Sequence, residues 1–180
     1  MTTRLRSLLA VATLAPLLFA ANANATNQFD RESKTPLTAE EEVQDPAVVS
    51  DGLSLAFIEI NARFKKARVR VTFSNLEGEV TRLHLHCAPA GSNGPIAIGL
   101  IDLVAIGQDN SETVKLDANT IRGTLRNNQF PKGGANACGI YNLRDLAHAI
   151  DAGQIYWNLH TTAFPAGELR GQVAPLTRSH

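Results

Sequence analysis

The sequence contains the stretch Ala67-Arg68-Val69-Arg70-Val71-Thr72-Phe73, in which apolar and polar side chains alternate strictly. Successive side chains of a β-strand point to opposite faces, so this pattern predicts a strand with one buried and one solvent-facing side. Residues 53–60 just before it are apolar and β-prone, and the polar residues 61–66 connect the two segments. Together the two segments predict a β-hairpin.

Similar short segments follow along the rest of the chain, separated by turns rich in Gly, Pro and Asn. One helix is expected after Asn142, a good N-cap, because apolar residues recur at helical spacing as far as Gly153. Many short strands with a single helix predict an all-β fold, an antiparallel sandwich or barrel, since a parallel α/β fold needs several crossover helices. The further predicted strands are residues 80–87, 96–103, 114–116, 120–125, 154–161 and 168–173.

The first residues are typical of a secretory signal peptide. Arg4 and Arg6 precede an apolar run over residues 7–20, and overlapping A-x-A sites end at Ala25. A membrane anchor would need about 20 apolar residues, which is longer than this run. We therefore expect residues 1–25 to be a signal peptide and the protein to be secreted or periplasmic, without stable membrane insertion after cleavage. The expected order is then a flexible leader over residues 26–36, a domain over 37–175 and a tail over 176–180.

Charge argues against nucleic acid as a partner. Removal of residues 1–25 leaves 15 basic and 17 acidic residues, a net charge of −2 on the mature chain. A protein that binds phosphate backbones needs a concentrated basic face. The local cluster Arg63, Lys65, Lys66, Arg68 and Arg70 is interpreted instead as the solvated edge of the hairpin.

Two cysteines are present, Cys87 and Cys138. In an oxidising compartment an even pair is most simply a disulfide, while free thiols and metal ligation are the competing interpretations.

Histidines gather on the polar sides of two predicted strands. His84 and His86 alternate with leucines on residues 80–87. On residues 154–161, the side chain of His160 points to the face away from the apolar residues. If these strands are neighbours, three imidazoles can converge on one copper or zinc ion. Asn158, Glu168 and Arg170 are candidates for a supporting shell, with Glu168 orienting a ring and Arg170 pairing with Glu168. The alternative is a structural hydrogen-bond network made of the same residues on a wet sheet face.

Catalytic residues are not predicted. Neither cysteine is expected to act as a nucleophile, and no serine lies in a G-x-S-x-G turn. His148 falls on the side of the predicted helix away from its apolar residues, so we expect it to be exposed.

Two long motifs resemble the signatures of the CHRD (chordin) domain family. The first is His84-Leu85-His86-Cys87-Ala88-Pro89-Ala90-Gly91 followed by Asn93-Gly94-Pro95, with Ala88 where Gly is usual. The second runs from Asp151 through Tyr156-Trp157-Asn158-Leu159-His160-Thr161 to Pro165-Ala166-Gly167-Glu168-Leu169-Arg170-Gly171-Gln172. The resemblance implies a secreted, Greek-key-like antiparallel β-sandwich, and the family has no established reaction or ligand.

These observations lead to an ordered set of expectations. The first is an exported, non-catalytic binding module with a transition-metal site, copper or zinc, at His84, His86 and His160. The second is a passive extracellular or envelope interaction domain, for an unknown partner, in which that face is a structural network. A metal-dependent enzyme comes third: the H-x-H strand resembles the copper ligands of Cu/Zn superoxide dismutase, but the bridging histidine and aspartate set of its zinc site is not found.

Overall fold

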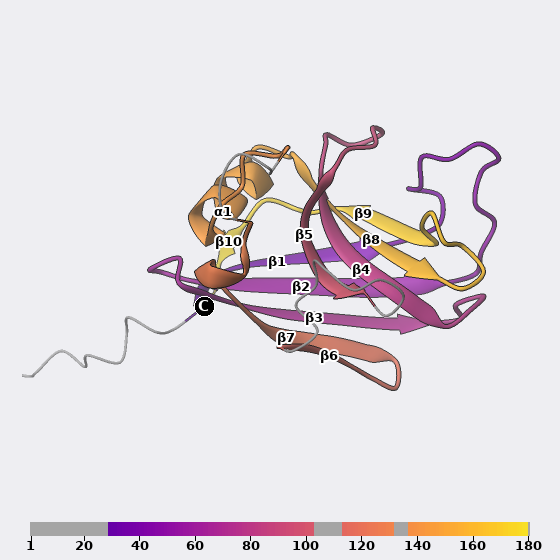
Figure 1. Cartoon of the computed structure of the whole chain (residues 1–180), viewed down its shortest axis with the longest axis horizontal. Helices are drawn as coiled ribbons and strands as arrows, with labels where there is room; N and C mark the ends of the chain where they lie inside the picture. Colours follow the sequence, from indigo (N-terminus) through magenta and orange to yellow (C-terminus); the bar gives the residue numbers. More distant parts are fainter. Residues whose placement is uncertain (1–28, 103–112, 132–136, 180) are drawn as a thin grey trace, which may run out of the picture.

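The protein is described here by a computed structural model covering residues 29–102, 113–131 and 137–179. The predicted signal peptide and the first residues of the predicted leader lie outside these ranges. Two antiparallel sheets pack face to face, which confirms the predicted β-sandwich. Figure 1 shows the two sheets with a helix at one end of them. None of the helices in the described ranges is long and apolar enough to span a bilayer.

The larger sheet has the strand order β10-β1-β2-β3-β7-β6, and the smaller has the order β5-β4-β8-β9. The chain therefore passes between the sheets after β3, β5, β7 and β9. The larger sheet consists of β1 (Phe29–Leu37), β2 (Leu53–Asn61), β3 (Lys66–Ser74), β6 (Val114–Asp117), β7 (Thr120–Arg126) and β10 (Thr177–Arg178). The smaller sheet consists of β4 (Val80–Cys87), β5 (Ile96–Asp102), β8 (Ile155–Thr161) and β9 (Leu169–Gln172).

The predicted hairpin is confirmed, because β2 and β3 pair with Ile58 opposite Val69 and Ala56 opposite Val71. These side chains are buried, as the alternating pattern requires. The opposite sheet contributes Leu83, Leu85, Trp157 and Leu159 to the same core, all fully buried. Burial of this apolar surface is the main term that stabilises the sandwich.

The helix α1 (Leu143–Asp151) begins where it was predicted. The Asn142 side chain accepts hydrogen bonds from the backbone N–H groups of Arg144 and Asp145. The apolar side of α1 is buried and His148 is exposed, both as expected. A short 3-10 turn, η2 (Asn127–Gln129), lies between β7 and α1.

The predicted flexible leader is wrong over residues 29–36. These residues form β1, which pairs with β2 along its length and with β10 at its start. Ser33, Thr35 and Leu37 face inward and are buried, so the strand alternates, but two of its three inward side chains are hydroxyls. The sequence therefore lacked the alternation of apolar and polar residues by which the other strands were predicted. The predicted tail likewise contains the short strand β10.

Candidate metal centre

Three histidines come together on the outer face of the smaller sheet. β4 pairs with β8 so that His84 lies opposite Asn158 and Arg82 lies opposite His160. Leu83 and Leu85 point into the core between the sheets, and His84 and His86 therefore point to the other side. The predicted adjacency of the two strands, on which the three-histidine site depends, is present in the fold.

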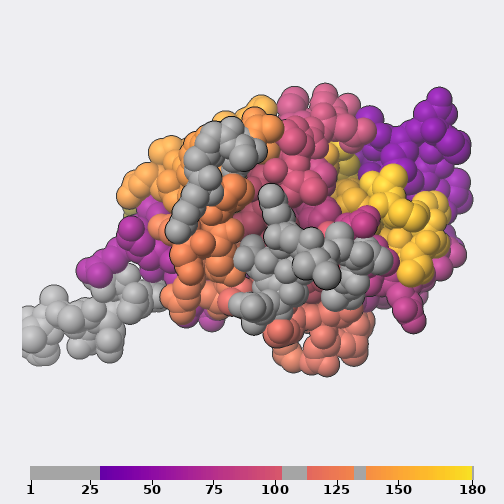
Figure 2. Space-filling model, viewed as in Figure 1, coloured from indigo at the N-terminus to yellow at the C-terminus, as the bar shows by residue number. Residues whose placement is uncertain are grey.

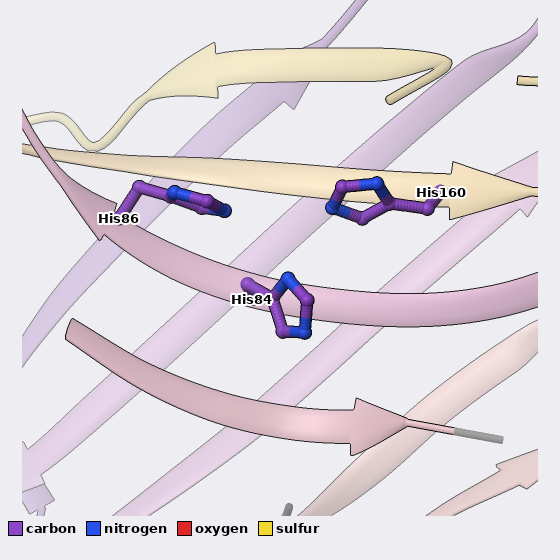
Figure 3. Close-up of side chains that lie close together, drawn as sticks. All are labelled: His84, His86 and His160. Atoms are coloured by element: carbon purple, nitrogen blue, oxygen red, sulfur yellow. The ribbon is translucent and has the colours of Figure 1, made fainter. Parts of the chain in front are cut away.

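The three rings converge. One ligand atom from each of His84, His86 and His160 lies within 4.8 Å of the other two. Ring centroids are 5.0 Å apart for His84 and His160, 5.5 Å for His84 and His86, and 6.4 Å for His86 and His160. Figure 3 shows the rings turned toward a common space above the two strands. An ion bound at about 2.1 Å from each nitrogen needs nitrogens about 3.4 Å apart, which small side-chain rotations would supply.

Hydrogen bonds fix the orientation of two of the rings. His86 Nδ1 lies 2.9 Å from the carbonyl oxygen of Gly94, and His160 Nδ1 lies 3.0 Å from that of Pro165. A carbonyl only accepts, so each Nδ1 donates its hydrogen and each Nε2 of the neutral ring keeps a lone pair. Backbone carbonyls orient metal-binding histidines in this way in many proteins.

Three ring nitrogens of the cluster make no hydrogen bond to the residues that the structure describes. Within the described part of the chain, Nε2 of His86, Nε2 of His160 and Nδ1 of His84 are buried and make no hydrogen bond. Leaving one buried polar atom without a partner costs on the order of 1 to 3 kcal/mol. Three such atoms in one cluster match the nitrogen donors that a transition-metal ion takes.

Burial keeps these histidines neutral. His84 is 5% exposed and His160 is 6% exposed. Burial, together with the nearby His160 and His86, lowers the pKa of His84 to about 3. Burial also lowers the pKa of His160 to about 4, against the opposing effect of its bond to Pro165, and it lowers the pKa of His86. All three rings are therefore in the metal-binding, unprotonated form at neutral pH.

Glu168 does not orient a histidine, so that prediction is wrong. Its carboxylate accepts hydrogen bonds from the Ser50 hydroxyl at 2.7 Å, the Glu77 N–H at 2.9 Å and the Thr161 hydroxyl at 2.5 Å. The side chain is fully buried and joins two loops to the end of β8. Its neighbours come from segments whose position the local sequence pattern does not reveal.

Arg170 does not pair with Glu168 either. Its guanidinium donates to Asn93 Oδ1 at 2.9 Å and to the Ser92 carbonyl at 2.7 Å, and it stacks on the Tyr156 ring at 3.6 Å. It is 1% exposed. Arg170 therefore holds the loop of residues 88–95 against the sheet.

The polar face is covered rather than wet, which corrects the expectation from strand alternation. Asn158 donates to the Glu42 carboxylate, and Gln44 donates to the Gly167 carbonyl at 2.9 Å. Burial raises the pKa of Glu42. Figure 2 shows the segment between β1 and β2 packed near the turn between β8 and β9. Glu42 carried no signal in the sequence, because it follows two other glutamates in a stretch that is typical of solvated loops.

Tyr156 is a second residue that the sequence analysis did not single out. Its ring stacks on His86 with centroids 4.9 Å apart, and its hydroxyl accepts from the Gly94 N–H at 3.2 Å. Strand alternation already placed Tyr156 on the histidine face, so this signal was available. The ring forms one wall of the candidate site.

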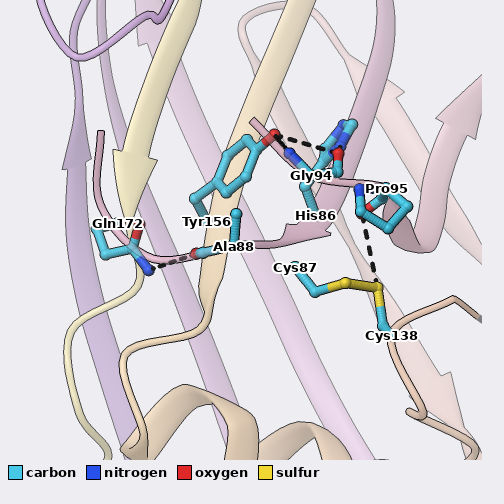
Figure 4. The surroundings of a disulfide bond; sticks show 8 residues. All are labelled: His86, Cys87, Ala88, Gly94, Pro95, Cys138, Tyr156 and Gln172. Atoms are coloured by element: carbon cyan, nitrogen blue, oxygen red, sulfur yellow. Dashed lines mark hydrogen bonds between the residues drawn. A yellow bond between two sulfur atoms is a disulfide. The ribbon is translucent and has the colours of Figure 1, made fainter. Parts of the chain in front are cut away.

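A disulfide joins Cys87 and Cys138, as predicted, with Cα atoms 5.8 Å apart. Cys87 directly follows His86, and its N–H donates to the Pro95 carbonyl at 2.9 Å. Figure 4 shows the disulfide beside the two ends of the loop of residues 88–95. Gly94 packs against the Cys87 carbonyl so closely that a Cβ there would overlap it. The disulfide and this contact together fix the loop that holds His86.

Comparison with known families agrees with this architecture. The family model described as CHRD domain matches residues 33–173. No curated protein and no solved structure matches the chain significantly.

Proposed function

Because the chain belongs to the CHRD domain family, which is of the secreted type, we propose that it is an exported module that binds one transition-metal ion through His84, His86 and His160. The family membership supports the exported setting. The metal site is supported by the side chains of this chain alone.

The observation that carries the proposal is the cluster of three unpartnered, buried imidazole nitrogens. A structural network would satisfy these atoms with protein donors. The polar network that does exist uses Asn158, Glu168 and Arg170, and its hydrogen bonds join them to loop residues and to Thr161 at the end of β8. A passive interaction domain would therefore explain the network but leave the histidine nitrogens unexplained.

The donor set favours copper or zinc. Neutral imidazole suits both ions, and Cu²⁺ leads in raw affinity for nitrogen ligands. Calcium and magnesium prefer oxygen ligands, so they fit poorly here. Three histidines also leave a coordination position for water or a further ligand, which is the arrangement that a metal-dependent enzyme would need.

The disulfide supports export to an oxidising compartment, the periplasm or the cell exterior. The pattern of residues 1–25 supports the same destination. The intact mass of protein from its native host tests this, since export with cleavage predicts a chain that starts at Thr26.

Calorimetric titration tests the metal site. Metal-stripped protein titrated with Cu²⁺ and Zn²⁺ should bind one equivalent of at least one of them, and both His84→Ala and His160→Ala should weaken that binding at least about tenfold. His148→Ala is the matched control, because it removes an exposed histidine on α1 and should leave binding unchanged. Binding that His84→Ala and His160→Ala leave untouched would refute the site.

A further inference from the structure

The outer face of the larger sheet carries an aligned set of cations. Register brings Lys34 of β1 opposite Phe57 of β2, Phe57 opposite Arg70 of β3, Arg70 opposite Arg122 of β7, and Arg122 opposite Lys115 of β6. We call these five residues the cationic row. The four basic members are exposed.

Repulsion between the basic side chains of the cationic row destabilises the sheet when no anion is bound. Neighbouring strands lie about 4.8 Å apart, so the row spans about 19 Å across five strands. Arg70 faces Arg122, and Arg122 faces Lys115, and like charges directly opposite each other destabilise a sheet. An anionic ligand would remove this repulsion.

Two of the cations are held in place by an aromatic ring. The guanidinium of Arg70 lies 4.6 Å from the centroid of the Phe57 ring, and the ammonium group of Lys34 lies 5.7 Å from it. Within the described ranges, neither cation has a carboxylate at ion-pair distance. Arg122, in contrast, pairs with Asp117 at 2.5 Å. The Lys34 and Arg70 end of the row is therefore the part with uncompensated charge.

The row is narrow. The next residues along the strands, on one side, are Glu32, Glu59 and Arg68, of which Glu59 and Arg68 form an ion pair at 3.3 Å. On the other side lie Pro36, Leu55, Thr72 and Thr120, with Asp117 at the β6 end. A groove of about 540 Å³ lies beside the middle of the row; its lining includes Phe57, Arg70 and Arg122 of the row together with Glu32, Glu59 and Arg68. The row is thus flanked by Glu32 and Glu59 on one side, where Glu59 compensates the charge of Arg68, and by Asp117 on the other.

We propose that the cationic row binds a single chain of an anionic polysaccharide, with carboxylate or sulfate groups of the sugar chain paired first to Lys34 and Arg70, the members without a carboxylate partner. A single polysaccharide chain carries its negative groups along one line, as the row carries its positive groups. An anionic bilayer is planar and would also meet Glu32 and Glu59. A single-stranded nucleic acid binds by stacking its bases on aromatic rings, and the ring of Phe57 is already taken by Arg70 and Lys34.

This surface is separate from the metal centre. The row lies on the outer side of β1, β2, β3, β7 and β6, whereas the histidines lie on the outer side of β4 and β8. The hydrophobic core lies between them. Polysaccharide binding therefore does not depend on the proposed function, and each can fail without the other.

Binding of size-matched oligosaccharides tests the proposal, with heparin fragments as the sulfated probe, oligogalacturonate as the carboxylated probe and dextran as the neutral one. The mature protein should bind at least one charged probe, not dextran, and binding should weaken steeply between 50 and 200 mM salt, roughly as counterion release predicts. Lys34→Gln with Arg70→Gln should lower affinity about tenfold or more and reduce the salt dependence.

The matched control is Arg63→Gln with Lys65→Gln, which removes the same charge from the exposed turn between β2 and β3. It should change affinity less than about twofold. Lys115→Gln with Arg122→Gln tests the other end of the row should the first pair disturb folding. The proposal is overturned by no binding of either charged probe at low salt, by equal losses in the row and turn variants, or by tighter binding of a single-stranded oligonucleotide or of anionic vesicles.

Discussion

His84 of β4 and His160 of β8 lie on adjacent antiparallel strands with their ring centroids 5.0 Å apart, although the two strands are far apart in the sequence. The pairing of β4 with β8 is what turns an H-x-H strand and a single distant histidine into one cluster. The pH dependence of the site should therefore be set by the burial of this cluster, and should differ from that of free histidine.

The affinity for metal should persist at mildly acidic pH. Ordinary histidines, with a pKa near 6.5, would lose metal as pH falls below about 6. Here the pKa of His160 is about 4 and that of His84 about 3, so protons compete only at lower pH. Burial lowers the pKa of His86 as well, so calorimetry should show that Zn²⁺ affinity persists to lower pH than free imidazoles would allow and is lost by about pH 4. A His-Leu-His peptide is the control and should weaken near pH 6; a parallel loss in the protein would contradict the prediction.

The metal-stripped protein should lose stability as pH falls below about 6.5. The unfolded chain takes up protons at His84 and His160 near that pH, whereas the folded chain does so only near pH 3 and 4. The unfolded state thus binds more protons, and the free energy of unfolding falls on acidification by roughly 2 to 3 kcal/mol per histidine at pH 4. Glu42, whose pKa is raised, opposes this in part.

Urea unfolding from pH 7 to 4 measures the effect. A variant with His84→Gln and His160→Gln cannot titrate at these positions and should show a flatter profile. If the variant and the parent protein lose the same free energy, the histidines are not the cause.

Gly94→Ala should weaken both the fold and the metal site. The added Cβ would overlap the Cys87 carbonyl, so the loop must shift, and the Gly94 carbonyl would no longer hold His86 Nδ1 at 2.9 Å. Loss of such an orienting contact costs about tenfold or more in metal affinity. Thermal unfolding and Zn²⁺ titration check this, with Ser92→Ala as the control in the same loop because the exposed Ser92 uses its backbone carbonyl. Unchanged affinity in Gly94→Ala would show that the loop does not position His86.

The disulfide should contribute about 4 kcal/mol to stability. It closes a loop with a sequence separation of 51, and the chain-entropy model gives this value for a loop of that length. Replacing Cys87 and Cys138 together by alanine should lower the free energy of urea unfolding by that amount under oxidising conditions. A reducing agent should destabilise the parent protein but not the double variant; equal stability of the parent with and without reductant would contradict the prediction.

Local sequence patterns determined most of the secondary structure and the side on which each residue lies. Alternation predicted β3, β4 and β8 and placed His84, His86 and His160 on polar faces, while Asn142 predicted the start of α1. The two cysteines allowed only one intramolecular disulfide. These features depend on residues that are near one another in the chain, where the repeat of a strand or helix dictates which side chains share a face.

Only the tertiary structure decided how those faces are used. It placed β4 beside β8, formed β1 from a segment rich in polar residues, and directed Glu168 to Ser50 and Arg170 to Ser92 instead of to the histidines. It also aligned Lys34, Arg70 and Arg122 across separate strands. The physical reason is that strand order, register and loop position are set by packing between distant segments, and a local pattern carries no information about which segment will lie opposite.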